Sequence, residues 1–146
     1  MKVEKSAVIS ATPQQIWPYL IEPDKIMKWC GTFQKCDFAG DRFNGPGNRF
    51  YVEEKAGGPL LKIHFMVTEW TENQKLVFEM TSGNFVKSYE QEWTIEPLAA
   101  GSRVNFTEDV KMPLGVIGKL IGRLGRSSSE KHVTEMLSKL KNMAES

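Results

Sequence analysis

Polar side chains that could take part in chemistry are few on the strand faces expected to point inward. Tyr89, Gln91, Trp93 and Ile95 follow one another at every second residue, and residues at this spacing lie on one face of a strand. The tyrosine hydroxyl and the glutamine amide could each hydrogen-bond a carbonyl or hydroxyl group of a small molecule. Binding pockets for small molecules are typically apolar with a few such polar groups.

Glu108 shares a strand face with the apolar residues Val104 and Phe106. Two interpretations stay open. If this carboxyl lies deep in the core, burial raises its pKa and suits it to acid–base chemistry. If it lies at the end of the strand it is merely solvated, and this second interpretation is the one we prefer.

The sequence lacks the motifs of familiar catalytic and metal sites. It contains no Gly-rich phosphate loop, no GxSxG motif and no pair of histidines at metal-ligand spacing. His64 alternates with apolar neighbours and is expected to face solvent, and His132 lies within a long helical segment. Cys30 and Cys36 have no second pair, so neither a zinc site nor a CxxC motif is available. We expect no catalytic residue, no metal and no cofactor.

Composition argues for an ordinary globular protein. Of the 146 residues, 40% are hydrophobic and 25% charged, and 19 basic side chains against 18 acidic ones give a net charge of +1. This balance predicts no general attraction to nucleic acid. The first residues, MKVEKSAVIS, lack the apolar core of a signal peptide. We therefore expect a cytoplasmic protein whose thiols are reduced.

The elements that position these residues can be read from periodicity. Lys2–Ser10 alternates as a strand. Thr12 and Gln15 form a capping box with Pro13 at the first helical position, which predicts one short helix that ends before Pro23. Lys25–Trp29 predicts a second. Alternating runs separated by turn residues then predict antiparallel strands, at 33–38, 49–55, 61–68, 76–81, 88–95 and 103–109. In the run at 49–55 it stays open whether Arg49 and Tyr51 or Phe50 and Val52 face inward.

Met112–Met143 predicts a long C-terminal helix, with a break near Ser127–Ser129 as one option. Its second half is amphipathic, with apolar residues at three- and four-residue spacing: Val133, Met136, Leu137, Leu140 and Met143. The first half has glycines on that same side, at positions 115, 118, 122 and 125. These glycines could permit close contact with the sheet, leave open space for a ligand, or indicate that this part is not a regular helix.

The other side of that first half carries an apolar arc, Val116–Leu124, flanked by Lys119, Arg123 and Arg126. An apolar arc edged with basic residues is typical of a helix that lies on a membrane surface, and also of a contact in a homodimer. Cover by the sheet or by the Lys25–Trp29 helix is the third interpretation.

The chain as a whole resembles the START-like, helix-grip superfamily (SRPBCC), and within it the polyketide cyclase/dehydrase and lipid-transport family. The segments that carry the resemblance are 11–20 (ATPQQIWPYL), 23–29 (PDKIMKW), 93–97 (WTIEP) with 101–104 (GSRV), and 137–141 (LSKLK). The resemblance implies an α+β fold in one domain, residues 1–146. A curved antiparallel sheet of about seven strands surrounds the C-terminal helix, and two short helices follow the first strand.

The resemblance also implies a deep apolar cavity between sheet and helix. Relatives carry lipids, hormones or polyketides there, and some catalyse cyclisation or dehydration, without a catalytic residue common to the family. We therefore predict a non-enzymatic carrier or sensor of a hydrophobic small molecule. The alternatives are a polyketide cyclase or dehydratase, and a protein- or membrane-interaction module that uses Val116–Leu124. The predicted ligand-binding residues are Phe65, Phe78, Met80, Tyr89, Gln91, Trp93, Ile95, Phe106, Glu108, Gly118 and Gly122.

Overall fold

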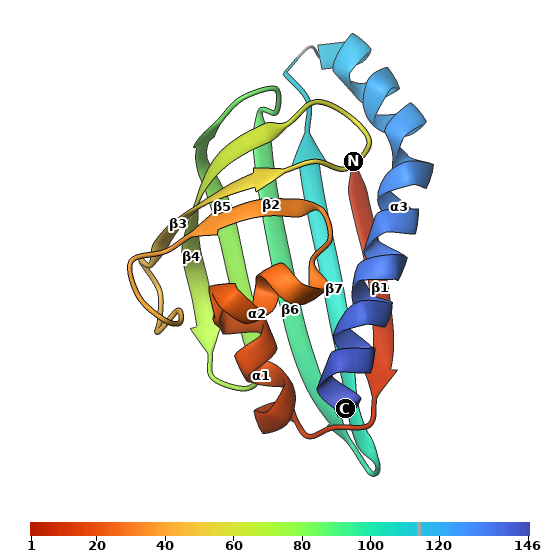
Figure 1. Cartoon of the computed structure of the whole chain (residues 1–146). Coiled ribbons are helices and arrows are strands. Elements are labelled where there is room, and N and C mark those ends of the chain that lie inside the picture. The colour runs from red at the N-terminus through yellow and green to blue at the C-terminus, as the bar shows by residue number, and fades with distance from the viewer. Residues whose placement is uncertain (114) are drawn as a thin grey trace.

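A computed structural model describes the whole chain except residue 114, and describes residues 115–125 by their backbone alone. Residues in strands outnumber those in helices, and the helices lie near both ends of the chain (Figure 1). The elements in chain order are β1 (Lys2–Ile9), α1 (Pro13–Ile21), α2 (Pro23–Trp29), β2 (Phe33–Asp37), β3 (Arg49–Glu54), β4 (Leu61–Thr71), β5 (Lys75–Gly83), β6 (Ser88–Leu98), β7 (Gly101–Lys111) and α3 (Gly115–Glu145).

The strands form one antiparallel sheet in the order β1-β7-β6-β5-β4-β3-β2. From β2 to β7 each strand pairs with the next along the chain, as short hairpin connections dictate, and β1 pairs with β7. The sheet curls so that β2 and β3 cross in front of β6 and β7, with α1 and α2 below them (Figure 1). The predicted sheet and the two short helices after the first strand are confirmed.

The start of α1 follows from local hydrogen bonding. The backbone N–H of Thr12 donates to the side chain of Gln15 at 2.9 Å, and the backbone N–H of Gln15 donates to the Thr12 hydroxyl at 3.2 Å. This reciprocal pair is the predicted capping box, and Pro13 occupies the first turn. Glu22 has extended backbone between the two helices, and Pro23 begins α2.

The long helix α3 is continuous, so the break considered near Ser127–Ser129 does not occur. Val133, Met136, Leu137 and Leu140 are buried on the face that periodicity indicated, and Met143 is half-buried. The predictions for Gly118 and Gly122, for the rest of the glycine stripe and for the Val116–Leu124 arc fall outside the residues whose side chains the structure describes.

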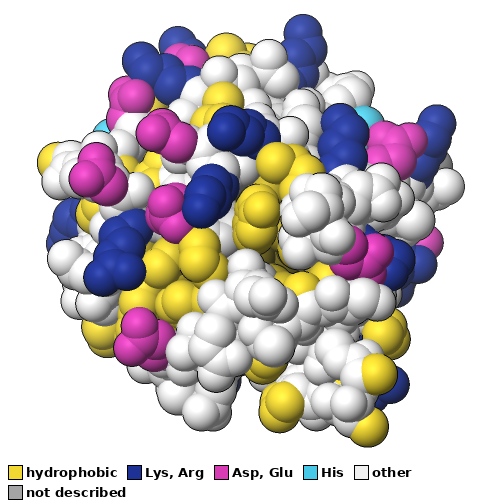
Figure 2. All heavy atoms as spheres, turned by 60° about the horizontal axis from the view of Figure 1, so that its bottom comes forward, with side chains coloured by type: hydrophobic (Ala, Val, Ile, Leu, Met, Phe, Trp, Pro, Cys, Tyr) yellow, Lys and Arg dark blue, Asp and Glu magenta, His cyan; other side chains and the backbone are white. Residues whose placement is uncertain are grey.

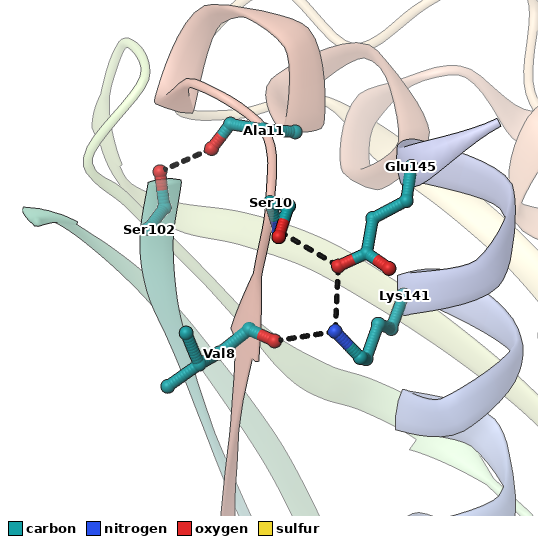
Figure 3. Close-up of polar contacts among 6 residues, drawn as sticks. All are labelled: Val8, Ser10, Ala11, Ser102, Lys141 and Glu145. Atoms are coloured by element: carbon teal, nitrogen blue, oxygen red, sulfur yellow. Dashed lines mark hydrogen bonds and ion pairs between the residues drawn. The ribbon is translucent and has the colours of Figure 1, made fainter. Parts of the chain in front are cut away.

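The C-terminal end of α3 is fastened to β1 by polar contacts (Figure 3). Lys141 Nζ donates to the backbone oxygen of Val8 at 2.9 Å and also contacts Glu145. The backbone N–H of Ser10 donates to the Glu145 carboxylate at 2.7 Å. The contacts with Val8 and Ser10 join α3 to residues far away in sequence. They therefore fix where the last turns of α3 lie along the first strand.

On the face drawn in Figure 2, acidic and basic side chains are interspersed among hydrophobic ones, without a field of one sign. This mixture agrees with the small net charge. Among the described residues, no helix is long and apolar enough to cross a membrane.

Candidate functional site

An apolar cavity lies where α1, α2 and α3 meet the concave side of the sheet. Its volume is about 20 Å³, room for about one water molecule. Apart from one glutamine and one thiol, its walls are hydrocarbon, aromatic and thioether side chains. The lining residues are Leu20, Ile26, Trp29, Cys30, Phe33, Phe43, Phe50, Phe78, Gln91, Trp93 and Met136.

Aromatic rings in contact with one another build the wall of this cavity. The Phe50 ring stacks on Phe43 at a centroid distance of 4.6 Å and meets Phe78 edge-on at 5.1 Å. Trp29, at the end of α2, meets Trp93 edge-on at 5.4 Å. Such offset and edge-to-face arrangements are the favoured ones for aromatic pairs. The wall is therefore a packed aromatic surface rather than a loose gap.

A second cavity, of about 30 Å³, lies next to the first and is the more polar of the two. Cys30, Gln91 and Met136 line both cavities. The remaining lining residues supply two carboxyl groups, two hydroxyl groups and an imidazole: Thr32, Glu54, Ala56, Glu108, Ser129, His132 and Val133. The site is thus one apolar compartment and one polar compartment that share a wall of three side chains.

A directional chain of hydrogen bonds runs from the apolar compartment to the two carboxyl groups. The indole N–H of Trp93 donates to Gln91 Oε1 at 3.3 Å, and Gln91 Nε2 donates to the Tyr89 hydroxyl at 3.0 Å. The Tyr89 Oη lies 2.9 Å from Glu108 and 3.1 Å from the nearer oxygen of Glu54. Because an indole N–H can only donate, it sets the orientation of the glutamine amide.

Glu54 is buried and Glu108 is half-buried, and this changes the acidity of both carboxyl groups. Burial raises the pKa of Glu54 from 4.5 to about 8, with the nearby Glu108 adding repulsion and the Tyr89 hydrogen bond opposing the rise. Burial likewise raises the pKa of Glu108 to about 7. The two groups interact through one hydroxyl and therefore titrate as a pair. At neutral pH the pair retains a proton that two exposed carboxyls would have lost.

The curl of the sheet brings these groups together. Gln91 and Glu108 are direct partners in the β6–β7 register, but Glu54 is on β3, three strands from β6 in the sheet order. Three flat steps would span about 14 Å. The pairing of β5 with β6 stops at Glu79 and Glu90, one residue from Tyr89. The sheet curls there, so that β3 crosses in front of β6 (Figure 1) and Glu54 contacts Tyr89.

Only some of the predicted ligand-binding residues line the two cavities. Phe78, Gln91 and Trp93 line the apolar cavity, Gln91 and Glu108 line the polar one, and Tyr89 joins the two carboxyls. Phe65, Ile95 and Phe106 are buried in the core but line neither cavity, and Met80 is half-buried. The open choice at 49–52 is settled in favour of Phe50 and Val52, which are 4% and 0% exposed.

Glu108 matches neither interpretation in full. It lies three residues before the end of β7 and is half-buried, its carboxyl accepts a hydrogen bond from the Tyr89 hydroxyl, and partial burial raises its pKa. His64 is exposed, as expected. His132 lines the polar cavity, where helix periodicity alone does not place it.

Glu54 is the member of the carboxyl cluster that the sequence prediction does not include. It is only 6% exposed, and it follows Phe50 and Val52 at every second position, so the alternation that buries those two residues also turns Glu54 inward. The sequence alone leaves open which face of this strand points inward, so it does not identify Glu54. The deep cavity implied by the resemblance stays a prediction, because the side chains of residues 115–125 fall outside the description, and the described residues line two small cavities.

The polar compartment does not offer a metal site. Within the residues that the structure describes, no group of three or more His, Cys, Asp or Glu side chains is arranged to hold a metal ion. Cys30 and Cys36 are both free thiols, and burial raises the pKa of each to about 12. Neither thiol is a reactive nucleophile at neutral pH.

Comparison with solved structures shows which fold this is. TTHA0849 from Thermus thermophilus has a TM-score of 0.79 at 18% identity, over 99% of this chain and 97% of that one. A START superfamily protein from Mycobacterium smegmatis has a TM-score of 0.76 at 17% identity, over 97% and 98%. The Zhui aromatase/cyclase from Streptomyces sp. R1128 has a TM-score of 0.77 at 12% identity, over 99% and 93%. The fold is therefore the START-like helix-grip fold, as predicted.

The sequence itself gives the family. Residues 1–145 match the family model described as polyketide cyclase / dehydrase and lipid transport. The chain belongs to this family. No curated protein matches it.

Proposed function

We propose that this protein is a carrier or sensor that binds a small molecule with an apolar, ring-containing body and one hydrogen-bonding end. The body occupies the compartment walled by Phe50, Phe78 and Trp93, and the end reaches the Glu54–Tyr89–Glu108 cluster. The observation that carries the proposal is the shared wall of Cys30, Gln91 and Met136 between an apolar and a polar cavity. Small-molecule sites combine these two features.

Binding requires the shared wall to move. The two cavities, about 20 and 30 Å³, hold water molecules rather than an organic ligand. Met136 has a flexible thioether chain that repacks easily, and the Gln91 amide can turn with its partners. A ligand that displaces Met136 would join the two compartments into one, by shifting the population toward a more open state.

The test is binding of the neutral dye N-phenylnaphthylamine, whose fluorescence rises in apolar surroundings. We expect saturable binding to the purified protein, with native mass spectrometry showing a complex of one dye per chain. Absence of any enhancement, together with a bare mass across a panel of neutral aromatic and lipid-like compounds, contradicts the proposal.

Two cysteine variants locate the dye. Cys30 is 3% exposed and lines both cavities, whereas Cys36 is half-buried and lines neither. Cys30→Met adds side-chain volume at the shared wall, so it should weaken dye binding about tenfold or more, while Cys36→Met should leave it unchanged. If both variants bind like the parent protein, the dye lies elsewhere. Thermal melting of each variant identifies any loss caused by overpacking.

The same cluster supports a second candidate, an enzyme of the cyclase or dehydratase type. Polar groups with perturbed pKa values are typical of catalytic sites, and burial raises the pKa of both Glu54 and Glu108. A carboxyl with a pKa near neutral can both accept and return a proton, and the aromatic wall could hold a flexible chain in a reactive conformation.

Nitrobenzisoxazole tests for this proton chemistry. A carboxylate removes the proton on its ring carbon, the N–O bond breaks, and a coloured cyanophenolate forms. Catalysis in the parent protein that is lost in Glu54→Gln or Glu108→Gln, but retained in Glu53→Gln on the other strand face, favours the enzyme. Equal rates in all four proteins favour the carrier.

A further inference from the structure

We propose that the polar end of the bound molecule is a hydrogen-bond donor, an amine or a hydroxyl group, and that a carboxylate or phosphate end is excluded. This inference rests on the proposed function, because it names the chemistry of the ligand for the same two-compartment site. It is carried by the direction of the hydrogen bonds that end at Glu54 and Glu108.

The direction of the chain is set at its apolar end. The Trp93 N–H donates to Gln91 Oε1, which leaves the Gln91 amide nitrogen to face Tyr89. Since the Tyr89 oxygen accepts from that nitrogen, its one proton is directed at the carboxyls. In each hydrogen bond the donor is the group nearer the apolar cavity. The chain therefore ends at two acceptors, the carboxyls of Glu54 and Glu108.

The acceptors at the end of this chain outnumber the donors. A tyrosine hydroxyl has one proton, yet oxygens of both Glu54 and Glu108 lie within 3.2 Å of it. Only one of the two carboxyls can receive that proton at a time. The other needs a proton of its own or a donor from elsewhere, and a ligand N–H or O–H in the polar cavity would supply it.

The charges of the side chains around the polar cavity also favour a hydrogen-bond donor over an anionic group. The titratable side chains that line it come from four parts of the fold: Glu54 on β3, Glu108 on β7, His132 on α3 and Cys30 after α2. Within the described residues, none of the lining side chains is lysine or arginine. A carboxylate or phosphate placed there would meet two carboxyls without a lysine or arginine among the described lining residues, and neighbouring like charges repel strongly.

An amine fits this environment best. An ammonium group in the polar cavity would donate to both carboxyls, beside the Tyr89 hydroxyl that already contacts each of them. Charge-assisted hydrogen bonds of this kind are shorter and stronger than neutral ones. A hydroxyl group would satisfy one carboxyl while the pair keeps its proton, so a neutral alcohol should also bind, but more weakly.

A matched series of naphthyl compounds tests the inference. Naphthylmethylamine, naphthylmethanol and naphthoate of one ring isomer share the same apolar body and differ at the polar end. Each is used to displace N-phenylnaphthylamine from the parent protein at neutral pH. We expect the amine and the alcohol to bind at least about tenfold tighter than naphthoate. Naphthoate binding as well as or better than the alcohol overturns the inference.

Variants connect this preference to the cluster. The double variant Glu54→Gln/Glu108→Gln keeps the shape of both side chains but turns two acceptors into amides that also donate. It should lose the preference of amine over alcohol by about tenfold, and should gain affinity for naphthoate. Glu53→Gln removes the same charge from the neighbouring position of β3, outside both cavities, and should change neither.

The possible failures can be told apart. If the parent protein binds no dye, the proposed function and this inference fail together. If the dye binds and naphthoate is the preferred competitor, the proposed function stands and the inference alone fails. A double variant that does not fold leaves the comparison of the three compounds on the parent protein, which decides the inference without it.

Discussion

Replacing Glu54 with glutamine should make the protein more stable at high pH and change little at low pH. Glu54 is buried, and its pKa in the folded protein is raised from 4.5 to about 8. The folded state therefore binds this proton more tightly than the unfolded chain does. The contribution of Glu54 to the free energy of unfolding is fully present below about pH 4.5, and it is lost as the pH rises through about 8.

The size of the effect follows from the pKa. One pKa unit corresponds to about 1.4 kcal/mol, so a rise from 4.5 to about 8 corresponds to at most about 5 kcal/mol for Glu54. The coupling to Glu108 reduces this value, and so does the effective dielectric constant around buried charges, which is well above that of dry protein. We expect the parent protein to lose about 2–5 kcal/mol between about pH 5 and pH 9 through this residue.

Urea unfolding followed by circular dichroism at a series of pH values measures this directly. Glu54→Gln should match the parent protein within about 1 kcal/mol near pH 5 and exceed its stability by about 2 kcal/mol or more near pH 9. Glu53→Gln is the control and should follow the parent protein throughout. If the parent curve is flat over this range and Glu54→Gln gains nothing at high pH, the carboxyl is not enclosed as described.

Three further predictions concern other parts of the fold. Tyr89→Phe removes the hydroxyl that accepts from Gln91 and donates to the carboxyls, so it should cost about 1–3 kcal/mol in urea unfolding at neutral pH; a change below about 0.5 kcal/mol contradicts the hydrogen-bond chain. Gly101→Ala should lower the free energy of unfolding by about 1–3 kcal/mol, because Gly101 has a φ of +99° and an added Cβ would meet the backbone oxygen of Ile9. The control is Gly58→Ala, which has open space around it and should melt within a few degrees of the parent protein. Glu145→Gln should speed amide hydrogen exchange in the last turn of α3, because Glu145 accepts hydrogen bonds from Ser10 and Lys141. Dye binding should not change, and an unchanged exchange rate means that this contact does not hold the helix end.

Most of the fold could be predicted because it depends on patterns that repeat along the chain. Alternation over β4, β6 and β7 determines which side chains point inward, and Thr12 with Gln15 marks the start of α1 through contacts only three residues apart. The antiparallel order follows from short connections. This alternation alone predicts that residues such as Phe78, Gln91 and Trp93 lie on the inner face.

The polar cluster could not be predicted in full because it depends on the curl of the sheet. Tyr89 and Glu54 are 35 residues apart in sequence and lie on strands that are not neighbours, so alternation says only that both point inward. How far Glu108 lies from solvent depends on what covers its strand, and that cover comes from β3 and α3. The small size of the two cavities depends on the packing of individual rings, such as Phe43 against Phe50.

A crystal structure of the protein with naphthylmethylamine tests the central claim most directly. The account predicts that the naphthyl ring lies against Phe50, Phe78 and Trp93, with Met136 displaced, and that the amine nitrogen lies within hydrogen-bonding distance of Glu54 or Glu108. An amine found on the molecular surface, or a ring seated between the helices with its nitrogen pointing into solvent, would contradict the claim that the two compartments form one binding site.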